Sequence, residues 1–368
     1  MVNMKAKKIT AAVENKEQFE AVLKSGKVNT CYIDSCYFDA FDYAGCVRTA
    51  HEKGIACGLR LPQLWRDKAD KYFTDNAELI KRAGFDSYLF RNLEGLLFFK
   101  ENGLLYNDNS MIGDDKSINL IGDNESINLS GSDEASKETS KEVSKEASSV
   151  SYMLDHSIYM VNKEAFSELM SMLEASDCVA GFSGITLPLE LNLRELKKLN
   201  ADIKRLIAGS GNSEDRDNGS INSESINSGN MDSGSWKLKR EDPEYIESSQ
   251  KIIGTEFTVY GRVPMMASSQ CVKKTAAGCD KKPVTLTLKD RTGALMPVKN
   301  CCRFCFGTVY NSVPTVLYDM TKEVDEINAD SLRYEFTTET GREVVAVLNG
   351  EKPENGAFTR GHFKKSVE

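Results

Sequence analysis

The chain has 368 residues, 40% of them apolar, which is enough for one large domain or two ordinary ones. It begins without a secretory signal, and no stretch approaches the roughly 18 apolar residues of a membrane span, so we expect a soluble, cytoplasmic protein with no membrane partner. The formal charge of −8 hides a basic stretch at 261–305, where nine lysines and arginines accompany two aspartates.

Strand and helix signals alternate along the chain. The predicted strands lie at 8–13, 29–33, 55–61, 86–92, 157–161, 178–185 and 257–260. The predicted helices lie at 16–23, 38–52, 70–82 and 163–173, with a short one ending at 100 and another beginning at 193. At least six strand–helix units precede the cysteine-rich region, which predicts an α/β fold with a parallel sheet, and a (β/α) barrel, complete or incomplete, better than a small open sheet. No Gly-x-Gly-x-x-Gly follows the first strand, which disfavours a dinucleotide-binding fold.

Two segments are predicted to be disordered insertions. Residues 107–152 and 210–236 are rich in Ser, Asn, Gly and charge and poor in aromatic residues. Such segments bury too little apolar surface to offset the entropy of ordering. We therefore expect the barrel in segments 1–106 and 153–209, and a last segment, 237–368, that joins the final barrel elements to a cysteine-rich metal-binding region.

Four of the ten cysteines form the pattern Cys271-x7-Cys279-x22-Cys302-x2-Cys305. Four thiolates suit tetrahedral zinc or an iron–sulfur cluster. Spacing alone favours zinc slightly, although the seven-residue gap is long for a zinc knuckle. We treat Cys301 as a spare thiol. The other five are expected to be small buried side chains: Cys31, Cys36, Cys46, Cys57 and Cys178.

Basic residues surround this cysteine pattern. Those that could attract RNA phosphates are Lys273, Lys274, Lys289, Arg291 and Arg303. A solvated loop whose lysines balance thiolate charge would have the same composition, so the two interpretations stand about even.

Polar side chains also follow the predicted strands, which is where barrel enzymes carry functional residues. Arginines are frequent among them: Arg60, Arg66, Arg91 and Arg262. Glu190 follows the sixth strand. Taken singly, each is an ordinary loop residue, but together they suggest a rim for an anionic ligand.

Several longer runs resemble one known family. They are VYGRVPMMASSQC, an AGC step, LKDRTGALMPVKN, CCRFC and VYNSVPTVLYD, with LPLELNLRELKKL upstream and TRGHFKKSVE at the end. They resemble the collagenase-like peptidase family U32, and most of all the carboxy-terminal part of its long members. The likeness covers most of the chain outside the two insertions.

The resemblance implies a chemistry that spacing alone does not. Family members related to RNA and ubiquinone hydroxylation carry a 4Fe–4S cluster on four cysteines, matched here by Cys271, Cys279, Cys302 and Cys305. The RNA-directed members hydroxylate a pyrimidine of transfer or ribosomal RNA without oxygen. The resemblance thus predicts an iron–sulfur RNA hydroxylase, or a subunit of one. Candidate catalytic residues are Glu190, Arg262 and, from the TRGH run, His362.

Two alternatives remain open. The family name implies a peptidase, but the three histidines lie in neither a His-Glu-x-x-His nor a Gly-x-Ser-x-Gly context. The long members also carry a further barrel upstream that this sequence lacks. A metal-stabilised, non-catalytic partner of a separate barrel subunit is therefore the other alternative.

Overall fold

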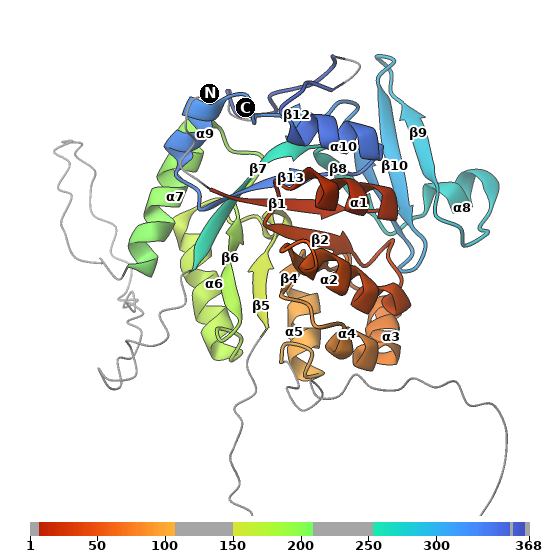
Figure 1. Cartoon of the computed structure of the whole chain (residues 1–368), viewed down its shortest axis with the longest axis horizontal. Helices are drawn as coiled ribbons and strands as arrows, with labels where there is room; N and C mark the ends of the chain where they lie inside the picture. The colour runs from red at the N-terminus through yellow and green to blue at the C-terminus, as the bar shows by residue number, and fades with distance from the viewer. Residues whose placement is uncertain (1–6, 107–149, 209–252, 354–355, 365–368) are drawn as a thin grey trace, which may run out of the picture.

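In a computed structural model of the chain, which describes residues 7–106, 150–208, 253–353 and 356–364, eight parallel strands close into a barrel (Figure 1). They pair in the order β1-β2-β3-β4-β5-β6-β7-β13, and β13 pairs with β1. Their bounds are β1 (Lys8–Val13), β2 (Thr30–Asp34), β3 (Ala56–Arg60), β4 (Ser87–Phe90), β5 (Ser151–Leu154), β6 (Phe182–Thr186), β7 (Gly254–Gly261) and β13 (Ser331–Glu335). The barrel is therefore complete within this chain, where the sequence had left an incomplete one open.

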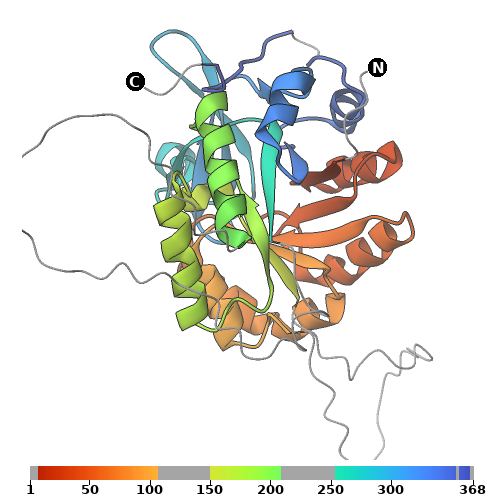
Figure 2. The ribbon, with the colours of Figure 1, turned by 90° about the vertical axis from the view of Figure 1, so that its left-hand side faces the viewer.

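Helices surround the strands (Figure 2). They are α1 (Lys16–Ser25), α2 (Tyr43–His51), α3 (Asp67–Asp75), α4 (Ala77–Ala83), α5 (Leu93–Glu101), α6 (Lys163–Ala175), α7 (Leu193–Ile207), α9 (Thr321–Ile327) and α10 (Gly341–Leu348), with 3-10 turns η1 (Ala40–Asp42) and η3 (His156–Ile158). Asparagines that follow strands begin four of these helices as N-caps: Asn15, Asn92, Asn162 and Asn192. None of the described helices is long and apolar enough to cross a membrane.

Three predictions need correction. The strand predicted at 157–161 is wrong, because the strand is β5 at Ser151–Leu154 and Tyr159 turns the chain with a φ of 58°. The first two residues of β5, Ser151 and Tyr152, therefore belong to the segment 107–152 that was predicted as the first insertion. The strand predicted at 178–185 begins later, at Phe182, and the helix predicted at 70–82 is two helices that meet at Asn76. Val150 is described as well, so residues 107–149 of the first insertion and all of 210–236 lie outside the described residues.

The inner face of the barrel is polar towards the carboxyl ends of its strands. Side chains alternate along a strand, so Thr10, Ala12 and Glu14 share the parity that points inward from β1. The Tyr32 ring fills space beside β3, where a Cβ on Gly58 would lie 2.4 Å from it. A glycine is therefore required at position 58.

A second, antiparallel sheet is inserted between β7 and β13. It has the strand order β8-β11-β10-β9, and with helix α8 it makes up residues 264–310, which we call the cysteine lobe. The bounds are β8 (Pro264–Ser268), α8 (Val272–Ala277), β9 (Thr285–Lys289), β10 (Leu295–Cys301) and β11 (Phe306–Tyr310). A short strand, β12 (Thr315–Val316), then pairs antiparallel with β7. In Figure 1 the arrowheads of β1 and β2 point towards β9, β10 and α8.

Candidate functional site

Charged side chains fill the mouth of the barrel at the carboxyl ends of its strands. On one side, Arg60 Nε donates to Asp34 Oδ2 at 2.7 Å and Nη2 donates to Glu14 Oε1 at 3.1 Å. Burial alone would raise the pKa of Asp34, but the guanidiniums of Arg60 and Arg91 outweigh it and lower that pKa. Asp34 is therefore held as a carboxylate.

Arg333 organises the other side of the mouth. Its side chain is fully buried, donates to Asp155 Oδ1 at 2.7 Å and forms an ion pair with Glu256. It also lies over the Tyr32 ring, 5.6 Å from the centroid. Burial would raise the pKa of Asp155, yet the cationic groups around it, His156 and Arg333 first among them, lower it. Five buried carboxylates of this mouth thus face three buried arginines and a lysine from the lobe: Glu14, Asp34, Asp155, Glu256 and Glu335, with Arg60, Arg91, Arg333 and Lys299.

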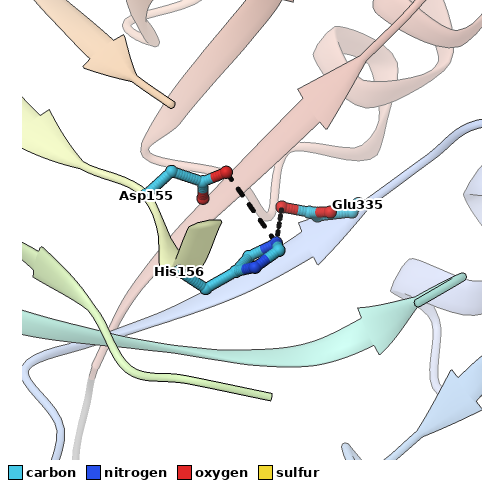
Figure 3. A group of neighbouring side chains, drawn as sticks. All are labelled: Asp155, His156 and Glu335. Atoms are coloured by element: carbon cyan, nitrogen blue, oxygen red, sulfur yellow. Dashed lines mark ion pairs between the residues drawn. The ribbon is translucent and has the colours of Figure 1, made fainter. Parts of the chain in front are cut away.

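Asp155, His156 and Glu335 bring three possible metal ligands together (Figure 3). His156 Nε2 lies 3.8 Å from Asp155 Oδ2 and 3.9 Å from Glu335 Oε1, and the three ligand atoms lie within 4.8 Å of one another. The same oxygens already face guanidiniums, with Arg91 Nε at 3.5 Å from Asp155 Oδ2 and Arg333 Nη1 at 3.6 Å from Glu335 Oε1. A divalent cation would be repelled by these two positive charges, so we interpret the group as part of the ion-pair network.

The cysteine lobe lies directly on this mouth. Lys299, on β10, forms an ion pair with Glu14 and donates to the Thr337 carbonyl at 2.7 Å. Tyr310, at the end of β11, is buried, and burial is the main cause of its raised pKa. The nearby charge of Glu14 raises the pKa of Tyr310 further. The lobe therefore completes one wall of the mouth.

The turn that carries the Cys-x2-Cys pair is fastened to the barrel. Arg303 donates to the carbonyls of Ser35 and Phe38, which follow β2, and its guanidinium lies 4.7 Å from the Tyr72 ring centroid. Phe304 is buried and stacks on Phe73 with ring centroids 5.7 Å apart. Arg303, one of the residues predicted to bind RNA, thus uses its N–H donors in contacts with the barrel.

The four predicted ligand cysteines lie on two neighbouring connections of the lobe. Cys271 precedes α8 and Cys279 follows it, while Cys302 and Cys305 occupy the turn between β10 and β11. Burial raises the pKa of Cys302, and charge on Cys271 and Cys279 raises it further, so these three thiols lie within electrostatic reach of one another. Cys305 accepts a 2.7 Å hydrogen bond from Lys68 Nζ.

Cys301 points away from this set. Its thiol lies 4.0 Å from the carbonyl of Cys36, and this neighbouring thiol adds to the rise in the pKa of Cys36 that burial causes first. Both are buried, as are the scattered cysteines, which confirms the prediction that those five are small buried side chains: Cys31, Cys36, Cys46, Cys57 and Cys178.

The spacing of the four thiols bears on which metal group they could hold. Four sulfurs bound to one zinc at about 2.3 Å would lie about 3.8 Å apart. Within the described ranges, no three of these sulfurs lie within 4.8 Å of one another, since the one such group is that of Asp155. A 4Fe–4S cluster binds each thiolate at a different iron and so accommodates a wider set. The donor type and number suit a 4Fe–4S cluster as well as a zinc ion.

The other predicted RNA residues are mostly at the surface. Lys274, Lys289 and Arg291 are exposed on the lobe. Lys273 is largely covered and forms an ion pair with Asp280. Three of the five therefore expose their positive charge to solvent.

The candidate catalytic residues gather loosely around one pocket. Arg262 and His362 line it together with Glu335 and the apolar side chains of Phe257 and Phe363. The pocket opens at the ends of β6, β7 and β13 and has a cavity volume of about 30 Å³. Glu190 does not line it, although its sequence neighbours Leu189 and Leu191 do.

Arg262 is held in place by three contacts. It donates to Thr338 Oγ1 at 3.1 Å, to the Asn311 carbonyl at 3.1 Å and to the Ser312 carbonyl at 2.5 Å. These contacts connect the end of β7 to Thr338 and to Asn311 and Ser312, which directly follow the lobe. His362 is exposed at the pocket rim.

Comparison with known proteins assigns no family to the chain. No family model and no curated protein matches the chain. An HpcH/HpaI aldolase of Desulfitobacterium hafniense is 12% identical over 94% of this chain and 89% of its own, with a TM-score of 0.35. The spore cortex-lytic enzyme SleL of Bacillus cereus is 9% identical over 96% and 75%, also at 0.35. A glycerol uptake operon antiterminator-related protein of Thermotoga maritima is 11% identical over 52% and 77%, at 0.27. The barrel assignment rests on the strand pairing itself.

Proposed function

We propose that this chain is an iron–sulfur enzyme of the kind that the U32 resemblance implies, acting on RNA as an oxygen-independent pyrimidine hydroxylase or as a subunit of one. One observation carries the proposal. The cysteine lobe seats its four-thiol group beside the carboxyl ends of the barrel strands, the end at which barrel enzymes act.

Cys271, Cys279, Cys302 and Cys305 would hold the cluster, which supplies one-electron chemistry when bound. The chain's own residues provide a rigid, charge-balanced mouth beside it. Arg333 and its partners fix the orientation of the buried carboxylates, and Lys299 ties the lobe to Glu14 so that the thiols and the mouth keep one geometry.

Charge on the lobe surface favours a nucleic acid as the partner. Lys274, Lys281, Lys282, Lys289 and Arg291 are exposed on the same lobe as the cysteines. Cations in such a group bind phosphates and release counterions, which predicts affinity that falls with salt. The lobe would then hold the RNA backbone beside the mouth.

The histidine contacts do not favour a peptidase. His51 pairs with Asp86 at 2.8 Å on the surface, and His156 faces Asp155 and Glu335. A nucleophilic peptidase places a hydroxyl or thiol next to its base. We therefore rank that alternative lower.

Anaerobic purification tests the proposal. The chain should be brown, with about four irons and four sulfides each. Cys302→Ser should lose the cluster, whereas Cys301→Ser, the matched control whose thiol contacts Cys36, should keep it. A colourless protein with one zinc would overturn the cluster assignment.

RNA mass spectrometry tests the substrate. A strain that lacks the gene should lose a hydroxyl on one pyrimidine, and the wild-type gene should restore it, whereas Cys302→Ser should not. An unchanged set of RNA modifications would contradict the assignment to RNA.

A further inference from the structure

We propose that Lys68, a barrel residue, is a positioning residue for the metal group: it holds Cys305 through a hydrogen bond and raises the reduction potential of the cluster that the thiol would bind. This inference rests on the proposed function. It assigns a role to a side chain that no sequence motif singled out.

The contact joins two separate parts of the molecule. Lys68 lies in the first turn of α3, which follows β3, and its Nζ donates to Cys305 Sγ at 2.7 Å. The contact thus links the first turn of α3 to one of the four predicted ligands.

Lys68 is unusual among the lysines of its helix. Lys71, one turn further, forms an ion pair with Asp75 at 3.0 Å. No ion pair joins Lys68 to a carboxylate within the part of the chain that the structure describes, although Asp67 and Asp70 lie nearby in sequence. Its ammonium group therefore donates to the Cys305 sulfur without a competing carboxylate among the described residues.

Cys305 has a backbone conformation that fits a fixed role. Its φ is 56°, in the left-handed region that non-glycine residues seldom adopt. The docked neighbours Arg303 and Phe304 hold this turn against the barrel. A donor from α3 then completes the set of contacts that fix the thiol.

The physical consequence is a shift in redox balance. Hydrogen bonds to ligating sulfurs are among the features that set iron–sulfur potentials. The reduced cluster carries one more negative charge than the oxidised cluster, so a cation at the ligand stabilises the reduced form more. Removing Lys68 should therefore lower the potential.

Potentiometric titration of the anaerobically purified full chain tests this. Dithionite, acting through viologen mediators, supplies the one electron that enters the cluster. Lys68→Met should change the reduced-to-oxidised ratio at a fixed potential about tenfold, which is about 59 mV for a one-electron couple. Lys68→Arg, which keeps the charge and the donor, should stay near wild type. Lys71→Met is the matched control and should not change the potential.

The outcomes separate the two proposals. If wild type carries no cluster, the proposed function fails and the role of Lys68 fails with it. If wild type carries the cluster and Lys68→Met has the same iron content and potential as Lys71→Met, the role of Lys68 alone is overturned. Loss of iron from Lys68→Met, with Lys68→Arg and Lys71→Met fully loaded, would support the same contact by a second readout.

Discussion

Replacing Arg333 by methionine should destabilise the barrel more than any surface substitution. Arg333 is fully buried at the centre of the mouth, donates to Asp155 and pairs with Glu256. Methionine fills much of the same volume but supplies neither the charge nor the donors. The buried carboxylates of Asp155 and Glu256 would then lose their main partner. Glu335 Oε1, which lies 3.6 Å from Arg333 Nη1, would lose an ion pair as well.

The size of this effect follows from the cost of unpaired buried charge. Breaking a buried pair by removing one partner costs about 3–5 kcal/mol. The whole free energy of unfolding of a domain is about 5–15 kcal/mol, so the variant should fold but should lose much of its stability. With an m-value of about 3 kcal/mol per M, the urea midpoint should fall by about 1–2 M.

Urea unfolding at two pH values checks the reasoning. In the wild type the pKa of Asp155 is lowered, so its contribution is present above the ordinary carboxyl pKa near 3.8 and is lost as the pH falls below it. The variant lacks that contribution, so its deficit should be large at pH 7, should persist down to about pH 4 and should shrink only as the pH falls below about 3.8. Arg291→Met, an exposed arginine of the lobe, is the control and should cost less than about 0.5 kcal/mol. A deficit below about 1 kcal/mol at pH 7, or one that is constant with pH, would refute the network.

Three further substitutions test other parts of the structure. Gly184→Ala should abolish soluble expression, because its φ is 152° and a Cβ would lie 2.1 Å from the Gly254 carbonyl oxygen, whereas Gly45→Ala, at an open position, should be tolerated. Arg303→Ala should loosen the lobe and leave the barrel intact, seen as faster hydrogen exchange confined to 264–310; unchanged exchange there would contradict the docking role. Lys299→Met should destabilise by about 2–4 kcal/mol in urea because Glu14 would lose its ion pair, and a stability equal to wild type would show that Glu14 is protonated in the fold.

Much of the barrel follows from local signals. The strands near 8–13, 29–33, 55–61, 86–92 and 257–260 lie close to those predicted, because each is a short apolar run bounded by turn residues. The miss at 157–161 has a physical cause: the run Ser-Ile-Tyr-Met-Val has strand propensity, but β5 had already ended and Tyr159 adopts the left-handed region. The true strand, Ser-Tyr-Met-Leu, adjoins a low-complexity segment, which hid it.

The site was less accessible from the sequence than the fold. Arg60 and Arg91 were identified from their place at strand ends, and they do face the mouth. Asp155, Glu256 and Arg333 were missed, since their meaning depends on which strands become neighbours on closure. A signal existed in the alternation within Ser-Leu-Arg-Tyr-Glu, which places Arg333 and Glu335 on one face of a strand. This alternation would have been informative only if an eighth strand had been predicted at that position.

Topology explains why the cysteines lie at the mouth of the barrel. The lobe follows β7, and any segment that follows a strand of a (β/α) barrel emerges at the carboxyl end of the strands. The described residues on either side of 107–149 follow α5 and precede β5 at the opposite end of the barrel, where Val150 N donates to the Leu105 carbonyl at 2.8 Å. Length added there need not disturb the mouth. The same order of elements that closes the barrel therefore directs the basic, cysteine-bearing lobe to the carboxyl ends of the strands.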